Sequence, residues 1–390
     1  MHPYLEEQLR VIRDEGRLRF LVDVVHLENG GIEIDGRTFL NLSGNDYLGI
    51  ATNRALAAEF FAGRTEANAL AAYGLGSTGS RMMTGNTHPY ALLEERLRAL
   101  YRGRSVLVFN SGYHANVGLL PGLAGKADLI LADKLCHASM IDGMRLARAR
   151  VIRYPHLDYQ TLERLLARHR DGYRQVFIVT ESIFSMDGDI ADLAELVRIK
   201  ERWNAALYVD EAHGVGARGA TGCGLAEEQG VLDRVDILVG TFGKAYGGQG
   251  AFVVGSDLLI QTVLNTARPQ IFSTGLPPIS VHWLCFVLDR IVTMDEERHY
   301  LADLAARFRR ALREAGLGTG GESNIIPVMI GDAVRAVAVA EAVREQGYWV
   351  TAVRPPTVPA GTSRLRLSLN AAMRWEQLEP LPALIAAAME

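Results

Sequence analysis

The sequence has little cysteine, no long apolar run and no large excess of charge of one sign. Its three cysteines, Cys136, Cys223 and Cys285, are scattered through 390 residues. They suit a reducing cytoplasm better than a disulfide framework, and their spacing does not indicate a metal site. No apolar run approaches the roughly 20 residues that a membrane-spanning helix needs. The net charge of −4 gives no reason to expect nucleic acid or an anionic membrane as a partner.

The amino terminus has a charged, helix-like pattern over residues 1–20, which is not the pattern of a signal peptide. Together with the composition, this pattern predicts a cytoplasmic protein. The chain is long enough to bury a sizeable core and to contain more than one structural unit.

The sequence does contain short apolar runs that alternate with helical patterns such as 88–101 and 193–203. Because the runs are rich in β-branched residues, they suit strands that are buried on both faces. The alternation predicts an α/β fold with a mostly parallel central sheet flanked by helices. The predicted strands are 105–109, 128–132, 175–180, 206–210, 236–240 and 251–255.

The pattern changes after about residue 285. A long helical stretch at 282–316 precedes two short strands, 325–330 and 364–369, which are separated by a helix at 333–347. We interpret this part as a smaller C-terminal α/β domain. The predicted division is an N-terminal extension with a helix and short strands (1–44), a large domain (45–285) and a small domain (286–390).

Polar residues follow four of the predicted strands at the point where each strand ends. Ser111 follows the first strand, Glu181 the third, Asp210 the fourth and Thr241 the fifth. Ligands of open parallel sheets bind beyond the carboxyl ends of the strands. These residues are therefore candidates for one common site.

Lys244 is the only charged residue in the glycine-rich stretch "GTFGKAYGGQG", which lies between two apolar runs. A solvated turn lysine is the ordinary interpretation, because lysine is rarely buried and glycines permit tight turns without any ligand. The alternative is a partly desolvated lysine whose lowered pKa allows it to attack an aldehyde.

Asp210 bears on this choice because it ends a run, "ALYVD", that predicts a buried strand. It can be a helix-cap or turn aspartate. A carboxylate at a buried strand end nevertheless needs a cationic or donor partner, and a protonated pyridine nitrogen would be one. A lysine for the aldehyde and an aspartate for the pyridine nitrogen are what pyridoxal 5′-phosphate (PLP) requires of a protein.

Further residues fit a PLP site. His213, three residues after Asp210, is placed to meet the ring hydroxyl, and His137 is a candidate to stack on the ring. Taken singly, each histidine is more often an ordinary hydrogen-bonding residue. The segment 110–116, "NSGYHAN", has the backbone N–H groups of a strand-to-helix turn, which suit a phosphate.

At this point the chain resembles a known family, the α-oxoamine synthases, a branch of the fold-type I PLP enzymes. The resemblance covers nearly the whole chain. Its motifs include "NLSGNDYLG" (41–49), "TESIFSMDGD" (180–189), "YVDEAHGVGARGATGCG" (208–224), "GTFGKAYGGQG" (240–250) and "FSTGLPP" (272–278). It implies decarboxylative condensation of an amino acid with an acyl thioester by a PLP-dependent homodimer.

The resemblance also implies roles for individual residues. Lys244 would bind PLP covalently and move the Cα proton, Asp210 would pair with the pyridine nitrogen, and Arg366 would grip the amino-acid carboxylate. The other implied cofactor contacts are His213, His137, Gly112, Tyr113, Ser185, Thr241, a supporting Glu181, and Thr274 from the second subunit. The other implied substrate positions are Arg19, Asn45, His137 and Thr357.

The tail at 347–373 is similar to the branch of the family that joins L-alanine to a pimeloyl thioester, carried by CoA or by acyl carrier protein. Two residues depart from the pattern of that branch: Met373 stands where histidine is frequent, and Glu211 where aspartate is common. A sister branch that uses glycine and acetyl-CoA shares most cofactor motifs. A non-catalytic partner subunit with a PLP fold is a further alternative, against which Lys244 and Asp210 argue.

Arg364 and Arg366 alternate along one predicted strand, so their side chains share a face. We expect Arg364 to be a solvated surface residue and Arg366 to face the site.

Overall fold

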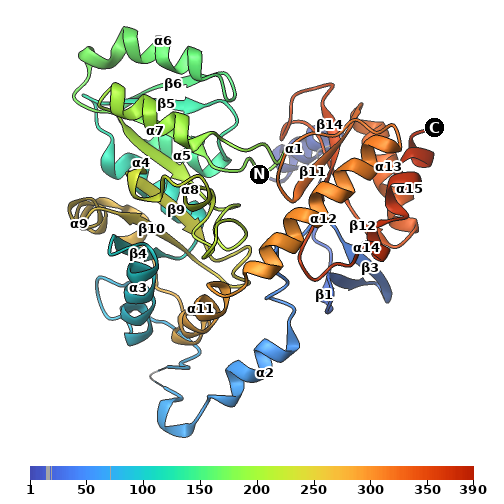
Figure 1. Ribbon diagram of the computed structural model, residues 1–390, viewed down its shortest axis with the longest axis horizontal. Helices are drawn as coiled ribbons and strands as arrows, with labels where there is room; N and C mark the ends of the chain where they lie inside the picture. Colours follow the sequence, from blue (N-terminus) through green and yellow to red (C-terminus); the bar gives the residue numbers. More distant parts are fainter. Residues whose placement is uncertain (15–17, 19, 71) are drawn as a thin grey trace.

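The computed structural model describes residues 1–14, 18, 20–70 and 72–390. Its centre is a seven-stranded sheet of order β4-β10-β9-β8-β7-β5-β6 (Figure 1). Only β10 runs antiparallel to its neighbours, so the predicted mostly parallel sheet is confirmed. The strands are β4 (Ser105–Phe109), β5 (Leu129–Asp133), β6 (Arg150–Tyr154), β7 (Val176–Glu181), β8 (Ala206–Asp210), β9 (Ile237–Thr241) and β10 (Ala251–Gly255).

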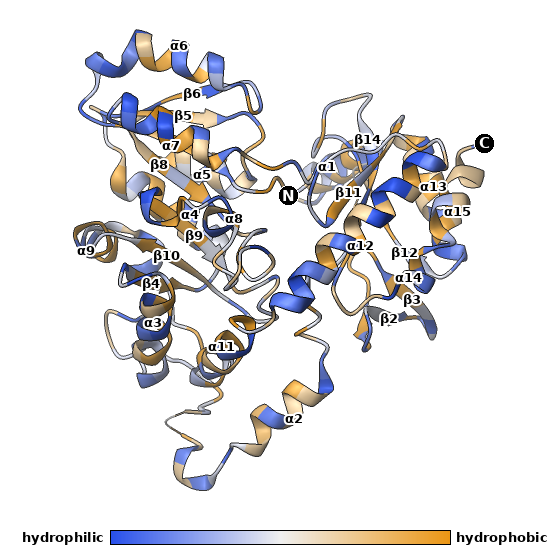
Figure 2. Cartoon of the chain, viewed as in Figure 1, coloured by the Kyte–Doolittle hydropathy of each residue, from blue (hydrophilic) through white to orange (hydrophobic). Residues whose placement is uncertain are grey.

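Both faces of this sheet are covered by helices, and side chains alternate between two apolar layers. On β5, for example, Leu129 and Leu131 belong to one layer, whereas Ile130 and Ala132 belong to the other. Figure 2 shows the central strands as hydrophobic and much of the outer helical surface as hydrophilic. One layer contains α4 (Gly112–Leu123), α5 (Ala138–Leu146) and α9 (Asp257–Thr266); the other contains α3 (His88–Leu100), α6 (Tyr159–His169), α7 (Leu193–Arg202) and α11 (Pro278–Ile291).

A smaller α/β unit lies beside the central sheet, and α12 (Asp295–Glu314) runs between the two (Figure 1). One of its sheets has the order β11-β14-β13 and the other the order β1-β2-β3-β12. Because β12 pairs with β3, backbone hydrogen bonds join the N-terminal strands to the C-terminal part of the chain. The strands are β1 (Val25–His26), β2 (Gly31–Ile34), β3 (Arg37–Asn41), β11 (Ile325–Gly331), β12 (Tyr348–Trp349), β13 (Thr351–Val353) and β14 (Ser363–Ser368).

The remaining helices lie at the ends of the chain or in connections. They are α1 (His2–Asp14), α2 (Arg54–Ala62), α8 (Leu225–Glu228), α10 (Arg268–Phe272), α13 (Ala333–Glu345), α14 (Trp375–Leu378) and α15 (Leu381–Met389). Within the described ranges, no helix is both long enough and apolar enough to cross a membrane.

Several elements differ from the sequence-based expectation; besides the short strands β12 and β13, which were not predicted, they are the helix at 282–316 and strand β6. The helix expected at 282–316 is two helices, because α11 ends at Ile291 and α12 begins at Asp295 with three acidic residues in its first turn, a favourable helix start. Strand β6 was not predicted. It is an edge strand in which every residue except Tyr154 is at least partly exposed, so it lacks the apolar run of the buried strands.

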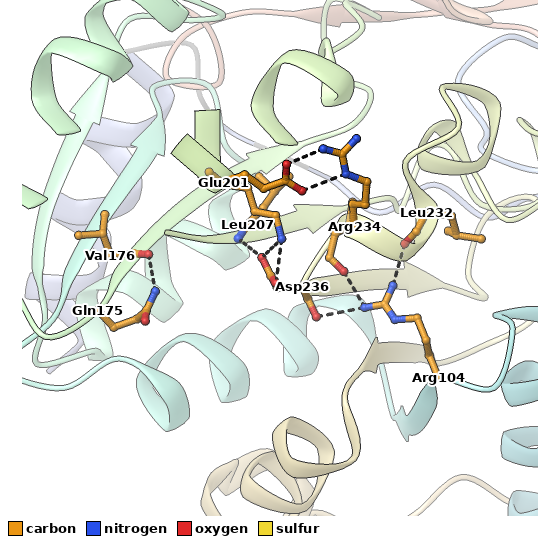
Figure 3. A network of polar contacts seen from close by, with 10 residues as sticks. Arg104, Gln175, Val176, Glu201, Leu207, Leu232, Arg234 and Asp236 are labelled. Atoms are coloured by element: carbon orange, nitrogen blue, oxygen red, sulfur yellow. Dashed lines mark hydrogen bonds and ion pairs between the residues drawn. The ribbon is translucent and has the colours of Figure 1, made fainter. Parts of the chain in front are cut away.

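Polar contacts tie the amino ends of β8 and β9 together at the end of the sheet opposite the polar strand ends (Figure 3). The Asp236 carboxylate accepts hydrogen bonds from Lys200 Nζ at 2.8 and 2.9 Å and from the Leu207 backbone N–H at 2.7 Å. Arg104 donates to the carbonyls of Leu232, Val235 and Asp236. These contacts anchor both strands, whose other ends present Asp210 and Thr241.

Candidate functional site

Two buried carboxylates lie side by side where β7 and β8 end. Glu181 and Asp210 are paired across the parallel strands and are 3% and 5% exposed. Asp210 accepts hydrogen bonds from Asn116 Nδ2 at 2.7 Å and from the Ala212 backbone N–H at 2.9 Å. The Oε1 atom of Glu181 has no hydrogen-bond partner among the described residues. The strand ends therefore form an acidic floor.

The glycine-rich stretch forms the turn between β9 and β10 and places Lys244 near the two carboxyl groups. The turn is closed by hydrogen bonds from Phe242 N to Gly250 O and from Gly248 N to Phe242 O, both 2.9 Å. Gly247 has φ +55°, and a Cβ there would lie 2.6 Å from the Ala51 backbone nitrogen. The glycines therefore allow a turn that is too tight for side chains, and this turn places Lys244 at a strand end.

Lys244 takes part in a chain of buried polar contacts. Its Nζ lies 2.9 Å from His213 Nε2, and His213 Nδ1 lies 2.5 Å from the Tyr47 hydroxyl. Lys244 and His213, both predicted site residues, are therefore in contact, and Asp210 lies near enough for its charge to act on Lys244.

Burial governs the ionisation of these groups. It lowers the pKa of Lys244 to about 8, although the charges of Asp210 and Glu181 act in the opposite direction. Burial, followed by the charge of Asp210, raises the pKa of Glu181 to about 8, so Glu181 is mostly protonated at neutral pH. Burial and the charges of Lys244 and Arg366 keep the pKa of His213 well below its ordinary value, so its imidazole is neutral. Lys244 is thus partly a free amine near neutral pH.

A cavity of about 590 Å³ opens above Lys244 between the central sheet and the smaller unit. It brings together seven of the predicted site residues, namely Asn45, His137, Ser185, His213, Lys244, Thr357 and Arg366. The rest of its wall is Leu18, Phe20, Ser43, Met186 and residues 351–356. Arg19 lies outside the described residues.

Arg366 enters the cavity from β14. It is 9% exposed and donates from Nε to the Ser185 carbonyl at 2.6 Å and from Nη2 to Asn45 Oδ1 at 3.1 Å. It forms no salt bridge with a carboxylate in the described part of the chain. A buried guanidinium without a counter-charge is a favourable place for the carboxylate of a ligand.

The expectation of a solvated Arg364 is wrong. Its side chain is buried and forms an ion pair with Asp187. The reason is that β14 is the middle strand of its sheet and faces the loop that carries Ser185 and Asp187, so both of its arginines are covered.

Three of the cofactor contacts that the resemblance implies, Gly112, Tyr113 and Thr274, lie around the start of α4 and do not belong to the cavity wall described above. Gly112 is the first residue of α4 and lies beside Thr241. Tyr113 is half-exposed and donates to Asp142 Oδ2 at 2.6 Å. Thr274 is exposed, and its carbonyl accepts a hydrogen bond from Asn110 Nδ2 at 2.5 Å.

The polar residues that form hydrogen bonds to Asp210 and His137 were not identified from the sequence. Asn116 Nδ2 donates to Asp210 and to Ser139 Oγ, and Asn116 Oδ1 accepts from the Tyr208 hydroxyl at 2.5 Å. Ser139 Oγ lies 2.8 Å from His137 Nδ1. Asn116 falls inside the quoted motif 110–116, where a polar residue among apolar ones was the available signal.

The two departures from the family pattern lie away from the cavity. Glu211 is buried and accepts hydrogen bonds from the backbone N–H groups of Leu225 and Ala226 at the start of α8. Burial raises its pKa to about 7. Met373 is fully buried beside Gly30. Both residues therefore serve packing and chain connection.

The donor and acceptor set fits PLP. Asp210 offers a buried carboxylate to a protonated pyridine nitrogen, and the unpartnered Glu181 Oε1 adds acceptor capacity beside it. Lys244 offers an amine of lowered pKa to the aldehyde. The start of α4 offers backbone N–H groups to the phosphate. The described residues thus include an amine, a buried carboxylate and helix-start N–H groups that match the aldehyde, the pyridine nitrogen and the phosphate of this cofactor.

The lowered pKa of Lys244 predicts its reactivity in the protein without cofactor. The rate of acetylation by acetic anhydride depends on the free amine, so for Lys244 it should rise with pH to a plateau with a midpoint near 8. An ordinary lysine has its midpoint near about 10.4. Mass spectrometry of peptides after brief labelling measures the acetylation midpoint of Lys244 and that of the exposed Lys126, which serves as the internal reference. A Lys244 midpoint equal to that of the reference would contradict a desolvated amine.

Comparison with known proteins agrees with this geometry. A family model described as aminotransferase class I and II matches residues 37–384. The 8-amino-7-oxononanoate synthase of Chlorobaculum parvum is 49% identical over 370 residues, which cover 95% of this chain and 94% of the relative.

Solved structures are similar over nearly the whole chain. A lysine-to-alanine variant of serine palmitoyltransferase from S. paucimobilis, with a bound PLP–myriocin aldimine, is 31% identical with a TM-score of 0.88, and the match covers 98% of this chain and 96% of that one. The 8-amino-7-oxononanoate synthase of Francisella tularensis is 26% identical with a TM-score of 0.76, covering 90% and 97%. The predicted cofactor and fold type are confirmed. The chain belongs to the class I and II aminotransferase family, in its α-oxoamine synthase branch of PLP-dependent acyltransferases.

Proposed function

We propose that the protein condenses L-alanine with a pimeloyl thioester to give 8-amino-7-oxononanoate, CO₂ and the free thiol, a step of biotin biosynthesis in the cytoplasm. The observation that carries the proposal is the 49% identity to an 8-amino-7-oxononanoate synthase over 95% of the chain. The cavity supports it, because it contains both an amine of lowered pKa and an arginine that pairs with no carboxylate in the described ranges.

Similarity of fold, taken alone, favours a serine palmitoyltransferase over an 8-amino-7-oxononanoate synthase. The TM-score is 0.88 to a serine palmitoyltransferase and 0.76 to an 8-amino-7-oxononanoate synthase. We give sequence identity the greater weight, because the shared fold does not specify the substrate. The serine palmitoyltransferase is 31% identical, well below the 49% of the Chlorobaculum parvum relative. A 2-amino-3-ketobutyrate CoA ligase, using glycine and acetyl-CoA, is the alternative that shares most cofactor motifs.

Arg366 and Lys244 have the main roles in the proposed mechanism. PLP, when bound, supplies an electron sink for the electron pair released at the amino-acid Cα. Arg366 holds the substrate carboxylate in a charge-assisted pair, and Asn45 beside it fixes the direction of the guanidinium. Lys244 accepts the Cα proton, which its lowered pKa permits near neutral pH. Asp210 holds a proton on the pyridine nitrogen of the cofactor.

The other assigned residues complete the proposal. His137 covers one face of the cofactor ring and the amino acid, His213 meets the ring oxygen, and Glu181 supports Asp210. Thr357, in the proline-rich segment that forms the outer cavity wall, faces the acyl thioester. Arg19 is assigned to the substrate site, and the remaining cofactor contacts are Gly112, Tyr113, Ser185, Thr241 and Thr274. The acyl carrier is CoA or acyl carrier protein.

We further propose a homodimer in which Thr274 completes the partner's phosphate site. Large apolar side chains are exposed near α2, which stands away from the body of the chain (Figure 1), and near Thr274; they are Phe61, Leu70, Leu75, Met83 and Phe272. Exposed apolar surface of this kind favours association.

Mixed Lys244→Ala and Thr274→Ala protomers would then contain one intact site per heterodimer and exceed the activity of either parent. Activity no higher than the parental average would contradict a shared site.

The substrate assignment predicts the order of reactivity in a panel of amino acids and thioesters. L-Alanine should outcompete glycine and serine, and a pimeloyl thioester should outcompete acetyl and palmitoyl thioesters. Steady-state kcat/KM values for each pair measure this order. A preference for glycine with acetyl-CoA, or for serine with a palmitoyl thioester, would overturn the proposed substrates and leave the family assignment intact.

The assignment of Arg366 predicts the effect of its removal. Arg366→Ala should raise the KM for alanine by roughly thirtyfold or more, because loss of one partner of a buried charge pair costs about 2 kcal/mol or more. The KM for the thioester should change much less. Arg364→Ala is the matched control, since it removes a buried arginine of the same strand that pairs with Asp187. An equal rise of the alanine KM in both variants would indicate loss of strand structure and not of a carboxylate contact.

A further inference from the structure

Tyr47 lies at the junction between the two polar groups of the site. It is fully buried, and its hydroxyl is 2.5 Å from His213 Nδ1 and 3.1 Å from Asn45 Oδ1. His213 continues to Lys244 Nζ, and Asn45 Oδ1 also accepts from Arg366. One hydroxyl therefore joins the proposed base to the proposed carboxylate clamp.

The number of hydrogens in this chain is limited. Burial raises the pKa of Tyr47 to about 12, so its phenol keeps its single hydrogen at working pH. The imidazole of His213 is neutral and carries one N–H, on Nδ1 or on Nε2. Asn45 Oδ1 can only accept. The phenol can donate to Asn45 or to His213, but not to both.

Two hydrogen-bond arrangements satisfy these limits with the same number of protons. In the first, Tyr47 donates to Asn45, Nδ1–H of His213 donates to Tyr47, and the lone pair of Nε2 faces Lys244. In the second, Tyr47 donates to Nδ1, and Nε2–H of His213 points into the cavity. A donor facing Nε2, such as the Lys244 ammonium, favours the first arrangement. An acceptor facing Nε2, such as the free amine, favours the second.

We propose that Tyr47 is a positioning residue that sets which nitrogen of His213 carries the hydrogen, and that it thereby couples the protonation of Lys244 to the hold of Asn45 on Arg366. In the second arrangement Asn45 Oδ1 loses the hydrogen of Tyr47 and keeps only that of Arg366. The change needs one O–H rotation and a tautomer exchange, in which Nε2 takes the proton that leaves Lys244 and Nδ1 gives its proton to solvent, with no movement of the main chain. The inference rests on the proposed role of Lys244 as the base.

Other charged groups also face Lys244 and His213. They are Asp210 and Glu181 on the strand ends, His137 at the start of α5, and Arg366 on β14, which also faces the Tyr47 hydroxyl directly. All of them remain in a Tyr47→Phe variant. A change in the titration of Lys244 in that variant therefore reports the hydroxyl.

Tyr47→Phe should lower the midpoint of Lys244 acetylation by about one pH unit. Without the hydroxyl, the Nδ1–H form of His213 has a buried donor without an acceptor, so the arrangement that favours the ammonium is lost. Tyr246→Phe is the matched control: it lies two residues from Lys244, and its fully buried hydroxyl has no hydrogen-bond partner among the residues that the structure describes. This control should leave the midpoint unchanged. An unchanged midpoint in Tyr47→Phe, or an equal shift in both variants, would overturn the proposal.

The wild-type protein provides a second test that does not depend on the folding of a variant. In protein labelled with ¹⁵N-histidine and free of cofactor, the His213 resonances should change from the Nδ1–H to the Nε2–H pattern as pH rises through about 8. A His213→Gln spectrum assigns them. One constant tautomer across this range would overturn the coupling. Both readouts are independent of turnover, so the proposed substrates can fail while the role of Tyr47 stands.

Discussion

The constraint on which the site depends is the cost of burying the Lys244 amine. A buried ammonium must be neutralised or paired, and burial lowers the pKa of Lys244 to about 8 while Asp210 and Glu181 counteract that shift. Glu181, with its own pKa raised to about 8, is mostly protonated near neutral pH, which limits the repulsion between the paired carboxyls. Beside these two carboxyl groups, the Lys244 amine can therefore gain and lose a proton near neutral pH.

The fold produces this arrangement through the parallel strands. β7, β8 and β9 end together, so residues separated by about thirty positions in sequence meet at one edge. The contacts of Asp236 and Arg104 fix the opposite ends of two of these strands (Figure 3). The smaller unit adds Arg366 across the cavity, and its hydrogen bond to the Ser185 carbonyl joins the two parts of the chain at the site.

Much of this arrangement can be predicted from the sequence, because it follows from local patterns. Buried strands show as β-branched runs, and Asp210 and Lys244 follow such runs directly. Arg364 was assigned wrongly, since a strand pattern does not reveal that a loop from another part of the chain covers it. Tyr47 and Asn116 were missed because their partners, His213 and Asp210, lie far away in sequence. The edge strand β6 was missed because its residues face solvent.

In the proposed mechanism Lys244 and Asp210 act as one unit, in which the lysine moves the Cα proton and the aspartate keeps the cofactor able to take up the electrons. The most direct measurement is the exchange of the L-alanine Cα proton with deuterium in D₂O, followed by NMR without any thioester, in wild type and in Asp210→Asn. The account predicts steady exchange in wild type and a loss of about a hundredfold or more in Asp210→Asn protein that retains bound PLP, within the range expected for loss of charge stabilisation. Exchange at the wild-type rate in Asp210→Asn would contradict it.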